Sequence, residues 1–293
     1  MVKHYARERV FTAGDVARVN IYPVRKVARS RGAKRLPSRA CQEALNKRNS
    51  KKRFQDIVHL TFTKETGGLR LSLDYNGFIA REGRNPTEAE WKACVTRYFR
   101  LLRELYRANG GELFYALMTH VGRRAGKVHH HAIVSLPPRG VTREQVEELW
   151  REGYGNTASL KFINGSVGGL TSYFFDNSVD SKWSCSKNCK RPSERPYADG
   201  SPASVDYVDG HVTMADAKYI DSNPEDIGFI ERLFPGFAVS HVRVTPEYTI
   251  NEGGGVVMTI PAFGGPFLEI ELYRIEGKSK PVKLLGQTRK KRE

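Results

Sequence analysis

Three consecutive histidines, His129 to His131, stand inside a short run of apolar and β-branched residues between Lys127 and Ser135. Such a run is typical of a β-strand, in which successive side chains point to opposite faces. His129 and His131 therefore share one face, whereas His130 lies among apolar neighbours on the other, where we expect it to be a packing residue. Two imidazoles on one strand face supply half of a metal site, because their nitrogens can converge on one ion.

The strand before this one supplies a third ligand. It is predicted over residues 113–120 and ends at His120, and a basic loop at 121–126 joins it to the histidine strand as an antiparallel hairpin. We therefore expect His120, His129 and His131 to surround one cation, with open positions for water or phosphate oxygens. Mn²⁺ accepts imidazole and binds phosphate, Mg²⁺ prefers oxygen ligands, and Zn²⁺ would suit three imidazoles best by affinity.

A candidate nucleophile follows 42 residues after His131, at Tyr173, within a predicted helix at 168–175. A phenol with an ordinary pKa of about 10 attacks poorly at neutral pH, so it needs a cation or a base beside the developing phenolate. A metal next to such a phenol suggests attack on a phosphodiester. The alternative is that Tyr173 is a core aromatic of the helix, like its neighbours Phe174 and Phe175.

The net charge of +16 is unevenly distributed. Residues 1–53 carry 16 basic and 3 acidic residues, a net of +13, and residues 277–293 carry 7 and 1, a net of +6, which leaves −3 for residues 54–276. Basic extensions on a nearly neutral body favour a polyanion through counterion release, and nucleic acid is the usual partner. The alternative is that the basic ends only keep the protein soluble.

Several classes of protein are disfavoured. The four cysteines are irregularly spaced, which suggests neither a disulfide framework nor a zinc ribbon and favours a reducing, cytoplasmic setting. No apolar run of about 18 residues occurs, so we expect neither secretion nor a membrane partner. The segment 277–279 reads Gly-Lys-Ser but lacks the earlier glycine of a phosphate-binding loop, so no NTPase motor is encoded.

The remaining pattern predicts an α+β fold. Strands are expected at 57–63, 69–73, 113–120, 127–135 and 156–163, and helices from 85 to 108, from the Thr142/Gln145 capping box to Gly153, and at 168–175. This order favours an antiparallel sheet with helices on one face and an open opposite face that carries the metal site. We expect four parts: a basic N-terminal arm at 1–53, a core at 54–192, an extension with a loop, a helix and strands at 193–276, and a basic tail at 277–293.

These segments, in this order, resemble the three motifs of the HUH superfamily of single-strand endonucleases. The matching pieces are the strand at 60–62, the hairpin that ends in His129-His130-His131, and Tyr173. The resemblance is nearest to rolling-circle replication initiators of bacterial phages and plasmids. It extends over roughly residues 16–192 and includes 46–49, the helix with Trp150, and the segment 183–188.

The resemblance implies a ferredoxin-like core and a metal-dependent nick in single-stranded DNA at a specific sequence or hairpin. The tyrosine attacks the phosphate, leaving a 5′-phosphotyrosine link and a 3′-hydroxyl that a host polymerase extends beside a host helicase, and reversal rejoins the strands. By position, His129 and His131 match the histidine pair, His120 the third ligand, and Tyr173 the nucleophile. Relatives commonly have Lys three residues after the tyrosine, where this chain has Asp176.

Contacts to DNA are expected from basic and aromatic residues near the motifs. These are Arg123, Arg124, Lys127, Trp183, Lys187, Lys190 and Arg191. Three alternatives to the initiator remain open: a nucleic-acid-binding module on the same fold without catalysis, a relaxase or transposase that uses the same chemistry, and a hydrolase that attacks with metal-bound water.

Overall fold

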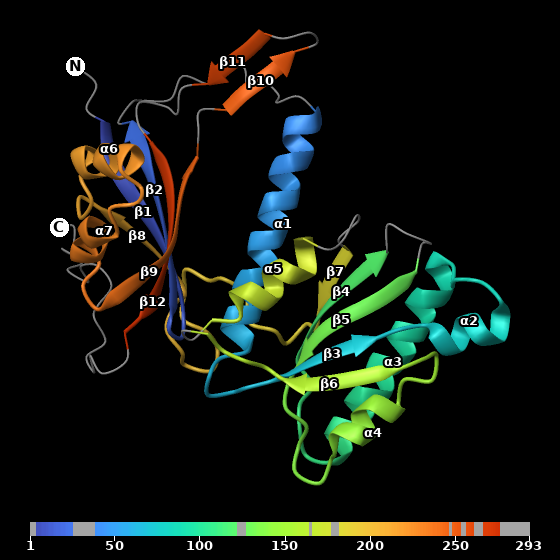
Figure 1. The fold of residues 1–293 in the computed structure, drawn as a ribbon. Helices are drawn as coiled ribbons and strands as arrows, with labels where there is room; N and C mark the ends of the chain where they lie inside the picture. The colour runs from blue at the N-terminus through green and yellow to red at the C-terminus, as the bar shows by residue number, and fades with distance from the viewer. Residues whose placement is uncertain are drawn as a thin grey trace. The chain divides into compact units, whose positions relative to one another are not determined.

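The computed structural model of the protein describes residues 4–25, 39–121, 127–163, 166–176, 182–245, 248–252, 256–260 and 266–275. The chain forms two compact units (Figure 1). Residues 49–191 make one, here called the histidine unit, and residues 1–48 with 192–293 make the other, the terminal unit. The described helices include none that is both long and apolar enough to cross a membrane.

The histidine unit is built on a five-stranded antiparallel sheet whose central strand carries the histidines. The strand order is β6 (Gly155–Ser159), β3 (Leu69–Leu73), β5 (Val128–Val134), β4 (Tyr115–Val121), β7 (Lys182–Cys185). In the register, His120 of β4 lies directly opposite His129, and Ser72 of β3 lies opposite His131. Directly paired residues share a face, so this register brings the three predicted ligands together.

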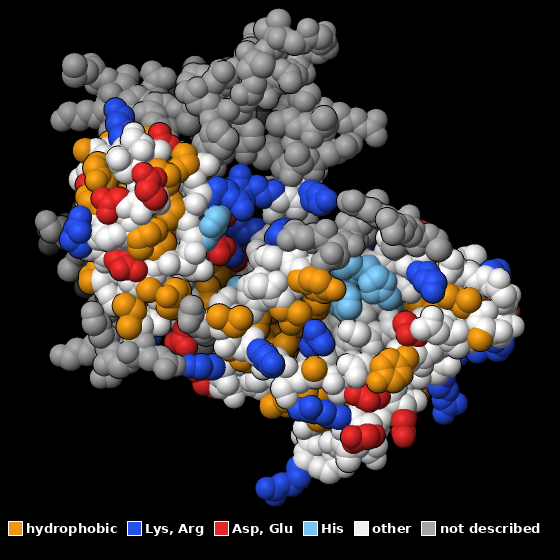
Figure 2. Space-filling view, in the orientation of Figure 1, with side chains coloured by type: hydrophobic (Ala, Val, Ile, Leu, Met, Phe, Trp, Pro, Cys, Tyr) orange, Lys and Arg blue, Asp and Glu red, His pale blue; other side chains and the backbone are white. Residues whose placement is uncertain are grey.

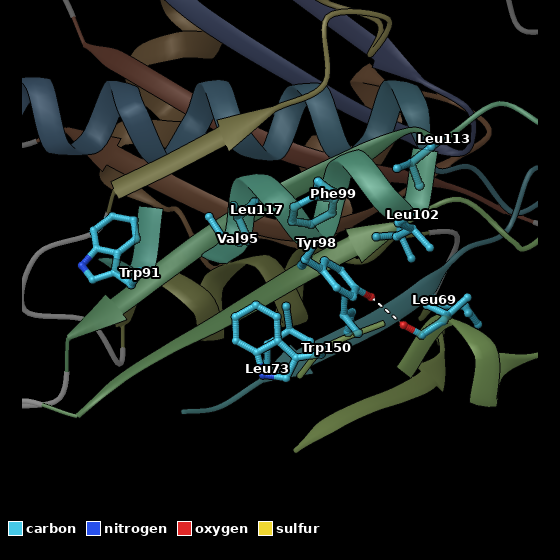
Figure 3. Close-up of a cluster of buried hydrophobic side chains, with 14 of the residues drawn as sticks. Leu69, Leu73, Trp91, Val95, Tyr98, Phe99, Leu102, Leu113, Leu117 and Trp150 are labelled. Carbon is cyan, nitrogen blue, oxygen red and sulfur yellow. Dashed lines mark hydrogen bonds between the residues drawn. The ribbon is translucent and has the colours of Figure 1, made fainter. Parts of the chain in front are cut away.

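Three helices cover one face of this sheet: α2 (Asn76–Glu82), α3 (Glu88–Ala108) and α4 (Arg143–Glu148). Thr87 caps the start of α3 and forms a capping box with Glu90, and the helix buries side chains three and four residues apart, as one helix face requires. These side chains pack against Leu69, Leu73, Leu117 and Trp150 (Figure 3). The capping box predicted at Thr142 and Gln145 is confirmed at the start of α4.

Helices also cover most of the opposite face, so the expectation that this face is open is wrong. α1 (Arg39–Thr61) and α5 (Gly168–Asp176) lie on it (Figure 1). Their buried side chains Phe54, Val58, Phe174 and Phe175 pack with Phe62 on Ala116, Met118 and Ile133 of β4 and β5. The physical reason is that this face of β4 and β5 is apolar except at its histidine end. Leaving these apolar side chains exposed to water would lower the free energy of unfolding.

The strand predicted at 57–63 is also wrong, because residues 57–61 are the last turns of α1. The alternation of Val58, Leu60 and Phe62 suggested a strand. The buried side chains instead follow the helical spacing of Phe54, Val58 and Phe62, and Ile57 is buried as well. The first of the three motifs in the HUH resemblance is therefore not a strand here.

The terminal unit replaces the expected N-terminal arm. Its sheet has the order β8 (Val205–Asp209), β1 (His4–Ala13), β2 (Val16–Arg25), β12 (Phe267–Arg274), β9 (Phe237–Thr245), all antiparallel. α6 (Met214–Ser222) and α7 (Ile227–Leu233) pack on one face, and β10 (Tyr248–Glu252) pairs with β11 (Val256–Ile260) separately. Residues 4–25 thus form a hairpin inside a core that α6, α7, β9 and β12 complete.

The chain divides near the expected boundaries of 54 and 192, at residues 49 and 191. The segment 26–38 and the basic tail at 277–293 lie outside the described residues. Strands β7 and β8 were not predicted, and β6 is shorter than the predicted 156–163. Short strands in polar sequence carry little hydrophobic periodicity, so tertiary pairing decides them.

Candidate metal centre and nucleophile

Three imidazoles cluster at one end of the sheet. The ring centroids are 5.0 Å apart for His120 and His129, 4.9 Å for His120 and His131, and 5.1 Å for His129 and His131. Figure 2 shows histidine side chains gathered at one place on the histidine unit, over the end of β4. The predicted common face of His129 and His131, with His120 beside them, is therefore present in the structure.

The spacing of these rings suits a shared ion. A metal–nitrogen bond of about 2.1 Å places each ring centroid roughly 3.2 Å from the metal, so two rings are about 4.5 Å apart at a right angle and about 5.2 Å apart at the tetrahedral angle. The three observed spacings lie between these values. Among the described residues, however, no set of three His, Cys, Asp or Glu side chains is already arranged to hold an ion. The rings therefore have suitable positions, and their orientations would have to adjust.

His131 is the most firmly oriented of the three. Its Nδ1 lies 3.0 Å from the hydroxyl Oγ of Ser72, and its ring stacks on Phe174 with centroids 5.1 Å apart and planes at 10°. Because Ser72 contacts Nδ1, Nε2 is the nitrogen that remains for a metal. Histidines that bind metals usually have such a polar partner on their other ring nitrogen. His129 has a similar outer contact, a hydrogen bond to the Lys127 backbone.

Burial keeps these imidazoles neutral. Desolvation, with the neighbouring rings of His120 and His129 and the charge of Arg70, lowers the pKa of His131 to about 3. Desolvation also lowers the pKa of His129. A neutral imidazole is the form that binds metal, so at neutral pH little proton release would oppose ion binding by these two side chains.

His130 points to the other face, as predicted, and it is a core residue. It is fully buried, with Nε2 2.8 Å from the hydroxyl of Tyr75 and Nδ1 3.1 Å from the hydroxyl of Thr119. Its ring packs against Trp91 and Trp150. Both ring nitrogens are engaged in the interior, so His130 is not available to the cluster on the opposite face.

Tyr173 lies beside the cluster and is not part of the core. Its side chain is 53% exposed, whereas those of Phe174 and Phe175 are buried. Its ring centroid is 6.1 Å from that of His131. The alternative that Tyr173 is a core aromatic is therefore wrong, because the adjacent phenylalanines fill the core and leave Tyr173 on the outer side of α5.

α5 is held in place by α1. The side-chain amide of Gln55 donates to the hydroxyls of Thr171 and Ser172, each at 3.3 Å. With the buried phenylalanines, these bonds fix the residues on both sides of the tyrosine. Asp176, which departs from the Lys expected from the HUH resemblance, is the last residue of α5, and its side chain lies outside the described residues.

The residues expected to contact DNA differ in their exposure to solvent. Lys127, Lys187 and Arg191 are exposed and Lys190 is half-buried, while Arg123 and Arg124 lie outside the described residues. Trp183 is half-buried, and its Nε1 donates a hydrogen bond of 2.7 Å to the hydroxyl of Ser50. Its ring packs in a T-shaped arrangement with that of Phe54, and the two ring centroids are 5.5 Å apart. These contacts favour a packing role for Trp183 between β7 and α1 over base stacking.

Sequence reasoning missed two polar residues beside the cluster, Ser72 and Asp74. Ser72 orients His131, and Asp74 follows β3 and acts electrostatically on His129. Its carboxylate accepts backbone N–H bonds from Asn76 and Tyr154. The alternation of Leu69, Leu71 and Leu73 with polar residues was visible in the sequence, but only the pairing of β3 with β5 shows that the polar side faces the histidines.

Comparison of the chain with protein-family models, with curated proteins and with solved structures finds no match.

Proposed function

We propose that this protein nicks and rejoins single-stranded DNA through a 5′-phosphotyrosine intermediate, at a specific sequence or hairpin, and so initiates rolling-circle replication of a phage or plasmid. The observation that carries the proposal is the clustering of His120, His129 and His131 around one point with the exposed Tyr173 beside them. The basic character of the chain supports a nucleic-acid partner.

In this proposal Tyr173 is the nucleophile and the three histidines hold a divalent ion, Mn²⁺ or Mg²⁺. The bound ion would neutralise charge on the phosphate and favour displacement of the leaving oxygen. The phenol oxygen forms a bond to phosphorus as the phosphorus–O3′ bond breaks. The phenol loses its proton, the 3′-oxygen gains one, and the DNA is left with a 3′-hydroxyl and a 5′-phosphate linked to Tyr173.

The fixed position of Tyr173 supports this role. A nucleophile must reach its target in a defined direction, and effective positioning removes much of the entropic cost of attack. The buried Phe174 and the bonds from Gln55 hold the helix on which Tyr173 stands. The phenol itself remains exposed, so a strand of DNA can approach it from solvent.

The test is an assay for covalent attachment. A single-stranded oligonucleotide library, labelled at the 3′ end, is incubated with the protein and Mn²⁺, and labelled protein is detected on a denaturing gel. We expect an adduct that is lost in Tyr173→Phe and in the double variant His129→Ala, His131→Ala. Tyr154→Phe is the matched control, because Tyr154 is also an exposed tyrosine of the histidine unit, at 65%, and should keep the adduct.

Other outcomes contradict the proposal in distinct ways. Cutting without an adduct would assign the reaction to a water nucleophile. Binding without cutting on every oligonucleotide would favour the module without catalysis. An adduct that survives Tyr173→Phe would reject Tyr173 as the nucleophile.

A further inference from the structure

The sheet of the terminal unit has a second face with a composition unlike its core. The core face packs on α6 and α7 through alternate apolar residues such as Val10, Val19 and Ile270. The other face carries aromatic and basic side chains on all five strands. We call this the aromatic face, and its members are Tyr5, Arg7, Arg9, Tyr22, Tyr207, Arg243 and Phe267.

The register places these side chains next to one another. Arg7 lies opposite Tyr22, and Arg9 lies opposite Tyr207 on the other side of β1. Tyr22 stacks on Phe267, with centroids 6.0 Å apart and planes at 22°. One row across the sheet reads Tyr207, Arg9, Asn20, Glu269 and Arg243, so aromatic and basic side chains share this face with a carboxylate.

Part of the aromatic face is accessible. Tyr207 is 45% exposed, Arg243 is exposed, and Tyr5, Tyr22 and Phe267 are half-buried. The part around Phe11 and Arg18 is buried. The accessible part thus lies around the tyrosines, and Tyr207 has the most exposed ring among them.

The basic side chains of this face differ in the acidic groups beside them. Arg7 is already neutralised by Asp209, to which it donates two bonds of 2.7 and 2.9 Å, and it lies over the ring of Tyr5. Arg9 and Arg243 make no ion pair within the part of the chain that the structure describes, and Glu269 lies directly opposite Arg243 on the same face. The face therefore offers aromatic rings together with positive charge.

This combination selects one kind of partner. Base faces stack on aromatic side chains only when they are unpaired, and guanidinium groups bind the phosphates between them, so a single strand fits and a duplex does not. Tyr22 and Tyr207 are two strands apart and offset by two residues along the strands, a separation of roughly 12 Å, so one nucleic-acid strand could place separate bases on the two rings.

We propose that the aromatic face of the terminal unit is a binding site for single-stranded nucleic acid, with bases on Tyr22 and Tyr207 and phosphates on Arg9 and Arg243. This site is distinct from the histidine cluster and goes beyond the nicking reaction. It stands whether or not a covalent adduct forms, because its test measures binding without metal.

The stacking role is tested with the full chain and a fluorescent 30-nucleotide strand, by anisotropy in buffer with chelator. Tyr207→Ala removes the ring, and Tyr207→Phe keeps it. Both variants lose the hydrogen bond from the Tyr207 hydroxyl to Glu194, so a difference in Kd between them reports the ring and not this bond. We expect Tyr207→Ala to raise Kd by about 5- to 100-fold and Tyr207→Phe to change it less than about twofold.

The phosphate role is tested by salt dependence. Arg243→Ala should reduce the slope of log Kd against log salt by about 0.7, the value for one phosphate contact on a single strand. Arg232→Ala is the matched control, because Arg232 is exposed on α7, which covers the core face, and should leave the slope unchanged.

Three results would overturn the proposal. The first is an equal Kd for Tyr207→Ala and Tyr207→Phe, whether that Kd matches the unmodified protein or is higher. The others are the same change of salt slope for Arg243→Ala and Arg232→Ala, and a duplex that competes for binding as well as the single strand does. DNA and RNA strands of one sequence are compared to decide which sugar the site prefers.

Discussion

Loss of the Ser72 hydroxyl should weaken metal binding without disturbing the fold. Ser72 touches His131 at Nδ1 and lies on β3, directly opposite it in the sheet. In Ser72→Ala the strand remains, because Ala fits the same backbone conformation, but the His131 ring loses the partner that fixes its tautomer and direction. The ring is then free to present either nitrogen to the ion.

The size of the effect follows from this contact. One hydrogen bond of ordinary strength is worth about 1 kcal/mol, or roughly fivefold in affinity, and removing the outer partner of a metal-binding histidine typically costs about 10- to 100-fold. The stacking of His131 on Phe174 persists in the variant and limits the freedom of the ring. We therefore expect the Kd for Mn²⁺ to rise about 5- to 30-fold.

The assay is isothermal titration calorimetry with Mn²⁺, combined in a double-mutant cycle with His131→Ala. If Ser72 acts only through His131, Ser72→Ala should have no effect in the His131→Ala background. Ser72→Thr keeps a hydroxyl on a strand that accepts β-branched residues, and it should restore most of the affinity. Equal losses in both backgrounds, or no loss in either, would refute the reasoning about this contact.

Two further predictions concern stability. His130→Ala should lower the free energy of unfolding by about 2 to 4 kcal/mol in urea denaturation, because it leaves a cavity and removes the imidazole that contacts the hydroxyls of Tyr75 and Thr119 in the core. A smaller loss than in His131→Ala would contradict the packing role of His130. His211 contacts the buried carboxylate of Glu8 at 3.1 Å, and this hydrogen bond raises the pKa of His211. The stabilisation is complete below the unfolded pKa of about 6.5 and is lost as pH rises through the raised folded pKa. His211→Asn should therefore lower the free energy of unfolding more at pH 6 than at pH 9, by on the order of 1 kcal/mol, and an equal penalty at both pH values would exclude this linkage.

The sequence alone determined the local features with strong periodicity or a fixed chemical signature. The helix at 88–108 was visible from its spacing of buried residues, and the capping box at Thr142 from two residue types three apart. The opposite faces of His129 and His130 followed from strand geometry alone, because adjacent side chains in a strand must point apart. The position of Tyr173 beside His131 was predicted from a resemblance and not from the residues between them.

Only the tertiary structure decided which surfaces are buried. Residues 57–63 carry a pattern that fits both a strand and a helix, and the contacts of Phe54, Val58 and Phe62 with the sheet selected the helix. Residues 4–25 are strands because partners from 205–209 and 267–274 pair with β1 and β2. Such pairing joins segments about 200 or more residues apart. Its free energy comes from burial in the finished core, which no local pattern encodes.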